Sequence, residues 1–299
     1  MKYNIYRFFM ALKITKIKIQ LAKVLYFVVR LFYKSDKQIV RRQGINFELY
    51  LNEGIYLSMF VLGGFQKHVY HHQLIKIAPD DVIFDVGGNV GIMSLFFAQQ
   101  ASEGQVHSFE PTWYAIEKFR NNLDLNPDLF QRITLNHCFV SSESSPTSNL
   151  VAYSSWPVVH TGEATHPIHR GVAKDAQNIS CISLDDYVTR RNMNKIDVIK
   201  IDTDGHELHV LRGAEEILKK FRPKIIFEIG IYIMEERDIS FKDYAVFFQN
   251  HCYTLFTTKG KSINENNYCH YIPKFGTIDV LALPSEMNLA SPQKNNDLL

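Results

Sequence analysis

Short apolar runs alternate with helical patterns through residues 82–283, and this alternation narrows the choice of folds more than any other part of the sequence. The runs are nearly continuous in hydrophobic residues, which is typical of strands buried on both faces. Such strands, separated by helices, form a mainly parallel sheet with helices on both sides. We therefore expect an α/β fold with strands at Val82–Val86, Gln105–Phe109, Ile133–Val140, Ile196–Ile201, Lys224–Ile229, Tyr253–Thr258 and Thr277–Leu283.

Apolar residues spaced three and four apart predict helices around these strands. They lie at Ile55–Leu62, Gln66–Ile77, Val90–Ser102, Thr112–Leu125, Gly205–Lys220 and Phe241–Asn250. A hairpin is expected over Val40–Leu51, and residues 141–178 are expected to be irregular apart from a short hairpin around Asn149–Tyr153. The 299 residues thus divide into a basic helical arm (1–38), a hairpin with helices (39–80), a core domain (81–285) and a flexible tail (286–299).

The arm differs from the rest of the chain in its charge. Residues 1–42 hold eleven Lys and Arg against one acid, Asp36, whereas the remainder holds 22 Lys and Arg against 30 acids. Apolar residues at 14, 17, 21, 24, 25, 28, 31 and 32 form one stripe of a helix, with Lys16, Lys23, Arg30 and Lys34 opposite. Such a helix can lie in the headgroup layer of an anionic membrane, or its stripe can pack against the protein or a second subunit. Both interpretations stay open.

Composition and cysteine spacing exclude several other classes of protein. With 46% hydrophobic and 21% charged residues, the chain is neither disordered nor of low complexity. Val24–Val29, the longest uncharged apolar stretch near the N-terminus, is far shorter than the about 20 residues that span a bilayer, and no signal peptide is evident. The four cysteines form no C-x-x-C pair, which favours a reducing compartment over a disulfide framework or zinc site. We expect a globular cytoplasmic protein, at most peripheral at the inner membrane face.

The strongest local signal is a glycine-rich turn after the first core strand. Asp85 lies at the end of that strand and is followed by Val-Gly87-Gly88-Asn89-Val-Gly91, which opens a helix. Glycines at the carboxyl end of a strand let the backbone approach a ligand closely. The carboxylate of Asp85 would repel the pyrophosphate of a dinucleotide, whose fingerprint reads G-x-G-x-x-G, but can hold an amino group. A cofactor with an amino-acid portion therefore fits this turn better than NAD.

A second acid follows the next strand. Glu110 lies about 20 residues beyond the glycine turn, where a carboxylate accepts hydrogen bonds from both hydroxyls of a ribose. Pro111 fixes the turn behind it, and Phe139 and Val140, at the end of the third strand, are expected to flank an adenine. Together with Asp85, these residues indicate S-adenosylmethionine as the cofactor.

From Gly44 to Leu283 the chain resembles the FkbM-type family of S-adenosylmethionine-dependent methyltransferases. The resemblance rests on Asp85–Gly91, Ser108-Phe-Glu-Pro111, Leu184-Asp-Asp-Tyr-Val188, Ile196–Glu207 continuing through Val210-Leu-Arg-Gly213, and Arg222-Pro223 before the strand ending in Glu228. It implies a Rossmann-like class I methyltransferase fold with a terminal antiparallel strand. It also implies O-methylation of a hydroxyl on a sugar, glycan or related natural product, with a carbohydrate or glycolipid as acceptor. Asp204-Gly-His206-Glu207 departs from the family's usual Glu-Gly-Ala-Glu.

Three residues are candidates for activating or positioning the acceptor, because a sugar hydroxyl is a poor nucleophile until its proton is removed. Asp202, at the end of the fourth strand, is the first candidate for general base, Glu228 is the second and His206 the third. The alternative for Asp202 is a cap on the following helix. The histidines at 68, 71, 72, 160, 166 and 169 show no metal-ligand order, so no metal site is predicted.

Two other classes of enzyme and one class of binding protein predict different features of the sequence. An NAD-dependent dehydrogenase or epimerase predicts G-x-G-x-x-G and usually a Tyr-x-x-x-Lys pair, and neither stands in a suitable place. A nucleic-acid methyltransferase would carry an Asn/Asp-Pro-Pro-Tyr motif where this chain has Asp202-Thr-Asp-Gly, so no nucleic-acid partner is predicted. A membrane-attached binding module that kept the fold without turnover is the non-enzymatic alternative.

Overall fold

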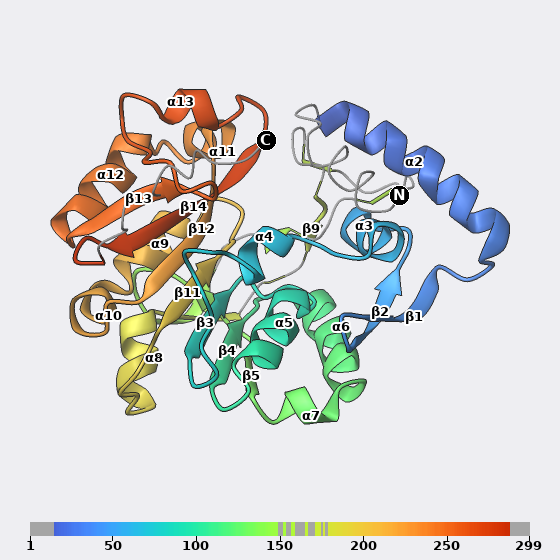
Figure 1. Ribbon diagram of the computed structural model, residues 1–299, viewed down its shortest axis with the longest axis horizontal. Coiled ribbons are helices and arrows are strands. Elements are labelled where there is room, and N and C mark those ends of the chain that lie inside the picture. The colour runs from blue at the N-terminus through green and yellow to red at the C-terminus, as the bar shows by residue number, and fades with distance from the viewer. Residues whose placement is uncertain are drawn as a thin grey trace, which may run out of the picture.

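A seven-stranded sheet forms the centre of the molecule (Figure 1). The computed structural model describes residues 15–148, 152–153, 157–158, 165–166, 171–174, 176 and 179–287. The strands of the sheet are β3 (Val82–Val86), β4 (Gln105–Phe109), β5 (Ile133–Asn136), β11 (Val198–Ile201), β12 (Lys224–Gly230), β13 (Tyr253–Thr257) and β14 (Thr277–Pro284). Their order is β13-β14-β12-β11-β3-β4-β5, and β14 alone runs antiparallel to its neighbours. This confirms the predicted Rossmann-like α/β fold and its antiparallel last strand.

Helices cover both faces of the sheet because side chains alternate along each strand. On β3, Ile83 packs into a core shared with α3 (Gly54–Leu62), α5 (Ile92–Gln100) and α6 (Trp113–Asp124). The next residue, Phe84, packs on the opposite face, where the helices are α8 (Leu184–Arg190), α9 (Glu207–Arg212), α10 (Glu215–Lys220) and α12 (Phe241–Asn250). The strands are therefore buried on both sides, as their continuous apolar sequences predict.

The order of the strands reverses between β3 and β11. The chain runs outward from β3 through β4 to β5 and then returns to β11, which pairs with the other edge of β3. In open α/β sheets, ligands bind in the crevice that this reversal creates at the carboxyl ends of the strands. The glycine turn after β3 and Asp202 after β11 lie at this point.

The N-terminal elements pack beside the core. The predicted hairpin is present as β1 (Lys37–Arg42) and β2 (Ile45–Tyr50), which pair antiparallel. The helix α2 (Thr15–Phe32) precedes them and packs along α3 at the edge of the molecule (Figure 1). Among the described residues, no helix has both the length and the hydropathy needed to cross a bilayer.

Three predicted elements are wrong in extent. The helix expected over Gln66–Ile77 is a single turn, α4 (Lys67–Tyr70), because the His72 side chain accepts the Leu74 backbone N–H and draws the chain out of the helix. The helix expected over Gly205–Lys220 is divided into α9 and α10 at Gly213. A Cβ on Gly213 would lie 2.1 Å from the backbone oxygen of Ser141, so the chain turns where it approaches that loop.

The strand expected over Ile133–Val140 is also divided. Its first half is β5, whereas β6 (Phe139–Val140) leaves the main sheet and pairs with β10 (Ile179–Ile182), which also pairs with β7 (Ser145–Ser148).

Of the hairpin expected around Asn149–Tyr153, residues 149–151 lie outside the described residues, and β8 (Ala152–Tyr153) pairs with β9 (Ala173–Lys174). Residues 1–14 of the arm and 288–299 of the tail also lie outside them. The remaining helices are α7 (Pro127–Phe130), α11 (Ile231–Glu236) and α13 (Tyr268–Tyr271).

Candidate active site

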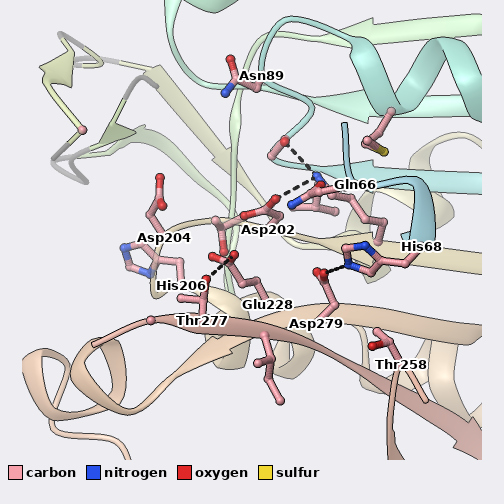
Figure 2. Close-up of a pocket in the computed structure, with 18 of the residues that line it drawn as sticks. Gln66, His68, Asn89, Asp202, Asp204, His206, Glu228, Thr258, Thr277 and Asp279 are labelled. Carbon is pink, nitrogen blue, oxygen red and sulfur yellow. Dashed lines mark hydrogen bonds and ion pairs between the residues drawn. The ribbon is translucent and has the colours of Figure 1, made fainter. Parts of the chain in front are cut away.

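A cavity of about 1260 Å³ opens at the carboxyl ends of the central strands. It brings together most of the predicted site residues, as Figure 2 shows for the acidic part of its wall. The predicted residues that line it are Gly87, Gly88, Asn89, Glu110, Pro111, Phe139, Val140, Asp202, His206 and Glu228. Asp85 and Gly91 do not line the cavity. Asp85 pairs with Lys200, which contacts the turn at Gly87, and Gly91 packs against the Phe119 ring.

The glycine turn lies in direct contact with two neighbouring strands. Gly87 has φ +79°, and a Cβ there would lie 1.8 Å from the backbone oxygen of Asp202. A Cβ on Gly88 would lie 2.0 Å from Oγ of Ser108, in β4. Only glycine lets the backbone follow this path, so Gly87 and Gly88 form a bare peptide part of the cavity wall. Gly91 has a packing role, because its missing Cβ leaves room for the Phe119 ring of α6.

Glu110 is held rigidly at the edge of the cavity. Its Oε2 accepts the backbone N–H of Asn89 at 3.0 Å, and its Oε1 accepts the N–H and hydroxyl of Thr112 at 2.9 and 2.6 Å. Burial raises the pKa of Glu110, and the hydrogen bonds from Thr112 and Asn89 oppose that rise. Glu110 lines the cavity, and since a carboxylate oxygen can accept two bonds, its Oε2 keeps one acceptor position that no hydrogen bond among the described residues fills.

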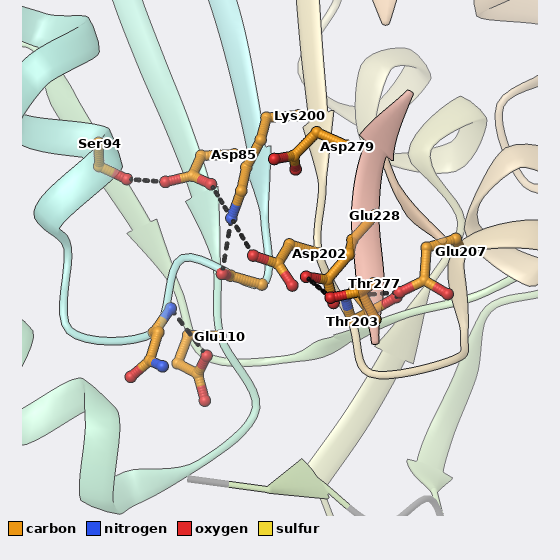
Figure 3. A network of polar contacts seen from close by, with 12 residues as sticks. Asp85, Ser94, Glu110, Lys200, Asp202, Thr203, Glu207, Glu228, Thr277 and Asp279 are labelled. Carbon is orange, nitrogen blue, oxygen red and sulfur yellow. Dashed lines mark hydrogen bonds and ion pairs between the residues drawn. The ribbon is translucent and has the colours of Figure 1, made fainter. Parts of the chain in front are cut away.

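Asp85 and Lys200 form a buried ion pair under the turn (Figure 3). Asp85 is 0% exposed, accepts a hydrogen bond from Ser94 Oγ at 2.5 Å and lies 3.2 Å from Nζ of Lys200. Lys200 also donates to the backbone oxygen of Gly87 at 3.2 Å and lies 3.6 Å from Asp202. Burial alone would lower the pKa of Lys200, but the carboxylates of Asp85 and Asp202 outweigh it and raise that pKa above its ordinary value. The ammonium group thus ties the strand, the turn and the cavity wall together.

One wall of the cavity is strongly acidic. Asp202 and Asp204 follow β11, Glu228 lies within β12, and Asp279 lies opposite Glu228 on β14. Burial and the neighbouring acids raise the pKa of Asp202, raise that of Asp204 to about 8, and raise that of Glu228 well above its ordinary value. Among the described residues, no three His, Cys, Asp or Glu side chains are arranged to hold a metal ion. Acids that destabilise one another in this way favour a ligand with positive charge.

Two histidines face the same cavity. Among the described residues neither ring nitrogen of His206 has a hydrogen-bond partner, although both are shielded from solvent. Burial and the nearby Arg237 lower the pKa of His206 to about 4, so its ring is neutral at pH 7. His68, from α4, meets Asp279 with 2.5 Å between Nε2 and Oδ2 (Figure 2). A neutral imidazole without partners is suited to a hydrogen bond with a ligand hydroxyl.

The cavity residues fit a nucleoside that carries a cationic portion. Glu110 offers a fixed acceptor for a diol, Gly87 and Gly88 offer a peptide surface without side chains, and the acidic wall suits an ammonium or sulfonium group. A pyrophosphate would face Asp202, Asp204 and Glu228 across the same space. The contact predicted between Asp85 and the amino-acid portion of the cofactor stays a prediction.

Sequence reasoning missed Lys200 and the His68–Asp279 pair as parts of the site. Both had a signal: Lys200 and Asp279 are charged residues inside strands that are otherwise apolar, and a buried charge needs a partner. The partners themselves come from distant segments, so the sequence alone does not identify them.

Asp204 makes the stability of the fold depend on pH. Its pKa is about 8 in the folded chain and near 4 for an ordinary aspartate, so between these values the folded state holds a proton that the unfolded state has released. Stability is therefore expected to fall as the pH rises from about 4 to about 8. Asp204→Asn should flatten this slope and raise the Tm at pH 8 by a few degrees. Asn tolerates the φ of +51° at this position.

Thermal unfolding of the parent and Asp204→Asn chains across that pH range checks this expectation. Superimposable plots of Tm against pH would show that Asp204 ionises normally in the folded chain.

Comparison with known proteins connects this site to one family. The sequence model of the Methyltransferase FkbM domain matches residues 85–255, more than half of the chain. The chain is 29% identical over 161 residues to the hexuronic acid methyltransferase AglP of Haloferax volcanii, covering 52% of this chain and 58% of that protein. It is 26% identical over 195 residues to the 2-O-methyltransferase NoeI of Sinorhizobium fredii, covering 58% of this chain and 78% of that protein. The match to the first of these relatives thus spans little more than half of that relative's length.

Among solved structures, the methyltransferase FkbM from Methylobacillus flagellatus matches with a TM-score of 0.44 and 16% identity. The match covers 70% of this chain and 45% of that one.

Proposed function

Because the chain belongs to the FkbM methyltransferase family, we propose that it is an S-adenosylmethionine-dependent O-methyltransferase that acts on a hydroxyl of a sugar, glycan or related natural product. The observation that carries the proposal is the cavity at the reversal of strand order, where Glu110, the glycine turn and an acidic wall surround one space. S-adenosylmethionine is the cofactor of this family, and its ribose diol and two cationic centres match those features.

The residues of the turn would hold the cofactor. Glu110 would accept hydrogen bonds from the ribose hydroxyls, and Phe139 and Val140 would flank the adenine. The Asp85–Lys200 pair would act from below by fixing the backbone of Gly87. When bound, S-adenosylmethionine supplies a methyl group on a sulfonium whose departure leaves a neutral thioether.

The acceptor hydroxyl needs a group that removes its proton and holds its oxygen in line with the methyl carbon. Asp202 is the first choice, because its raised pKa makes its carboxylate a stronger base than an ordinary aspartate. Burial and the neighbouring acids raise the pKa of Glu228, so it holds a proton more readily than an ordinary glutamate and suits a hydrogen-bond donor. His206, neutral and without a partner in the described residues, would hold a second hydroxyl of the acceptor.

A carbohydrate acceptor is supported by two observations. The cavity wall is rich in carboxylates and imidazoles that can bind hydroxyl groups, and the relatives named above are a hexuronic acid methyltransferase and a 2-O-methyltransferase. The basic residues Lys259, Lys261 and Lys274 lie on another part of the same cavity and would suit a sugar that carries a carboxylate. A uronic acid is therefore the acceptor we would test first.

The test is a transfer assay with S-adenosylmethionine and p-nitrophenyl glucuronide, with p-nitrophenyl glucoside as the uncharged counterpart. We expect S-adenosylhomocysteine and an O-methylated sugar to form in equal amounts, faster with the glucuronide. Asp202→Asn should lower kcat by roughly 10²–10⁴-fold. Failure to methylate either sugar, or a methyl group found on nitrogen or carbon of another acceptor, would overturn the proposed acceptor class.

A further inference from the structure

The helix α2 carries apolar residues on two different faces. One face is packed: Ala22 and Val29 are 7% and 9% exposed, and α2 contacts α3. Where the helix ends, the Tyr33 ring meets the Phe60 ring of α3 edge-on, with 5.1 Å between centroids. Neither Ala22 nor Val29 belongs to the stripe expected from the sequence, whereas Val24, Val28, Leu31 and Phe32 of that stripe are exposed.

The other face of α2 is apolar and exposed. Its residues recur at spacings of three and four, so they lie in one line along the helix, which we call the outer stripe. They are Val24, Phe27, Val28, Leu31 and Phe32, with exposures of 64%, 67%, 43%, 66% and 78%. Isolated exposed apolar residues are ordinary, but a continuous line of large ones marks an interaction surface.

Cations border the outer stripe. Lys23 and Lys34 are exposed, and neither has a carboxylate partner among the described residues. The one acid of residues 1–42, Asp36, already accepts the Tyr26 hydroxyl at 2.7 Å and lies 3.6 Å from Arg30. The surface thus combines apolar side chains with positive charge that no carboxylate of the described residues neutralises, which fits a partner that is both apolar and anionic.

We propose that α2 binds the surface of a bilayer that contains anionic lipid, with the outer stripe in the acyl boundary and Lys23 and Lys34 among the headgroups. Phe and Leu side chains insert at that depth, while long Lys side chains reach back to the phosphates. Cytoplasmic leaflets attract such basic segments through their anionic lipids. A second copy of the chain fits less well, because a two-fold contact through this stripe would set the same cations against each other.

The position of α2 gives this surface a consequence for the cavity. α3 packs against α2, as Figure 1 shows, and it also supplies Ile55 to the cavity wall. The outer stripe is on the face of α2 away from α3, so about two helix diameters, roughly 20 Å, would separate the membrane surface from the cavity wall formed by α3. Acceptors anchored in that membrane would then be concentrated beside the site.

The test is co-sedimentation of the full chain with phosphatidylcholine vesicles, with and without phosphatidylserine. We expect binding to the phosphatidylserine vesicles that weakens with added salt. Phe27→Ser/Leu31→Ser removes two side chains that would insert into the bilayer, so its vesicle affinity should fall about 10²-fold. Phe130→Ser, at a residue that is 53% exposed on α7, is the matched control and should bind like the parent.

Equal sedimentation of the parent and Phe27→Ser/Leu31→Ser chains would overturn the proposal, as would a parent that ignores phosphatidylserine. A dimer in sedimentation velocity that becomes a monomer in Phe27→Ser/Leu31→Ser, without vesicle binding, would assign the stripe to self-association instead. Binding of S-adenosylhomocysteine should be the same in all these chains, so this result is independent of the proposed enzymatic activity.

Discussion

Gly87→Ala should destabilise the protein by roughly 3–5 kcal/mol, far more than a single methyl group usually does. Part of this effect is conformational, because φ is +79° and an L-residue pays about 1–2 kcal/mol there. The larger part is steric. The new Cβ would lie 1.8 Å from the backbone oxygen of Asp202, so the turn and β11 would have to separate. S-adenosylhomocysteine binding should be lost together with the turn.

Gly63→Ala is the matched control for this prediction. Gly63 has nearly the same φ, +80°, but a Cβ there would meet no atom within 4 Å. Gly63→Ala should therefore show only the conformational part, about 1–2 kcal/mol. Urea unfolding followed by circular dichroism measures both. Equal losses of stability would mean that the turn does not press against β11 in solution.

Lys200→Met should cost about 3–5 kcal/mol of folding free energy, because it leaves Asp85 buried without its counter-charge. Asp85→Asn/Lys200→Met should recover part of that loss, since it removes both charges and leaves side chains of similar size. The difference between the double variant and the sum of the single ones is the coupling energy, expected at about 1–3 kcal/mol.

Lys195→Met is the control for Lys200→Met. Lys195 pairs with Asp80 at 2.5 Å, but both side chains are on the surface, where solvent screens the interaction and little stability depends on it. If Lys200→Met proved as harmless as Lys195→Met, the buried ion pair would not hold the site together.

The sequence allowed the local parts of the site to be predicted. Asp85, the glycine turn and Glu110 lie within one strand–turn–helix–strand segment, so their spacing alone places them at neighbouring strand ends. The parallel sheet was predictable for the same reason, because buried strands are short and continuously apolar.

The parts that could not be predicted depend on contacts between distant segments. Lys200 of β11 contacts Asp85 of β3, and His68 contacts Asp279, which lies 211 positions further along the chain. The outer stripe of α2 is a similar case: apolar spacing does not show which face of the helix packs on α3, and the structure buries Val29 while it leaves Phe27 exposed. The single turn of α4 depends on where the His72 side chain finds its partners.

Calorimetric titration with S-adenosylhomocysteine, with NAD in parallel, tests whether this cavity holds S-adenosylmethionine with Glu110 at the ribose. The parent should bind S-adenosylhomocysteine and give no heat with NAD. The Glu110→Gln chain should bind S-adenosylhomocysteine roughly 10–100-fold more weakly, because the substitution replaces a charged hydrogen-bond acceptor by a neutral one. The control is Glu117→Gln, at an exposed acid on α6, which should bind S-adenosylhomocysteine like the parent. Tight binding of NAD without a response to S-adenosylhomocysteine, or a folded Glu110→Gln chain that binds as firmly as the parent, would contradict the claim.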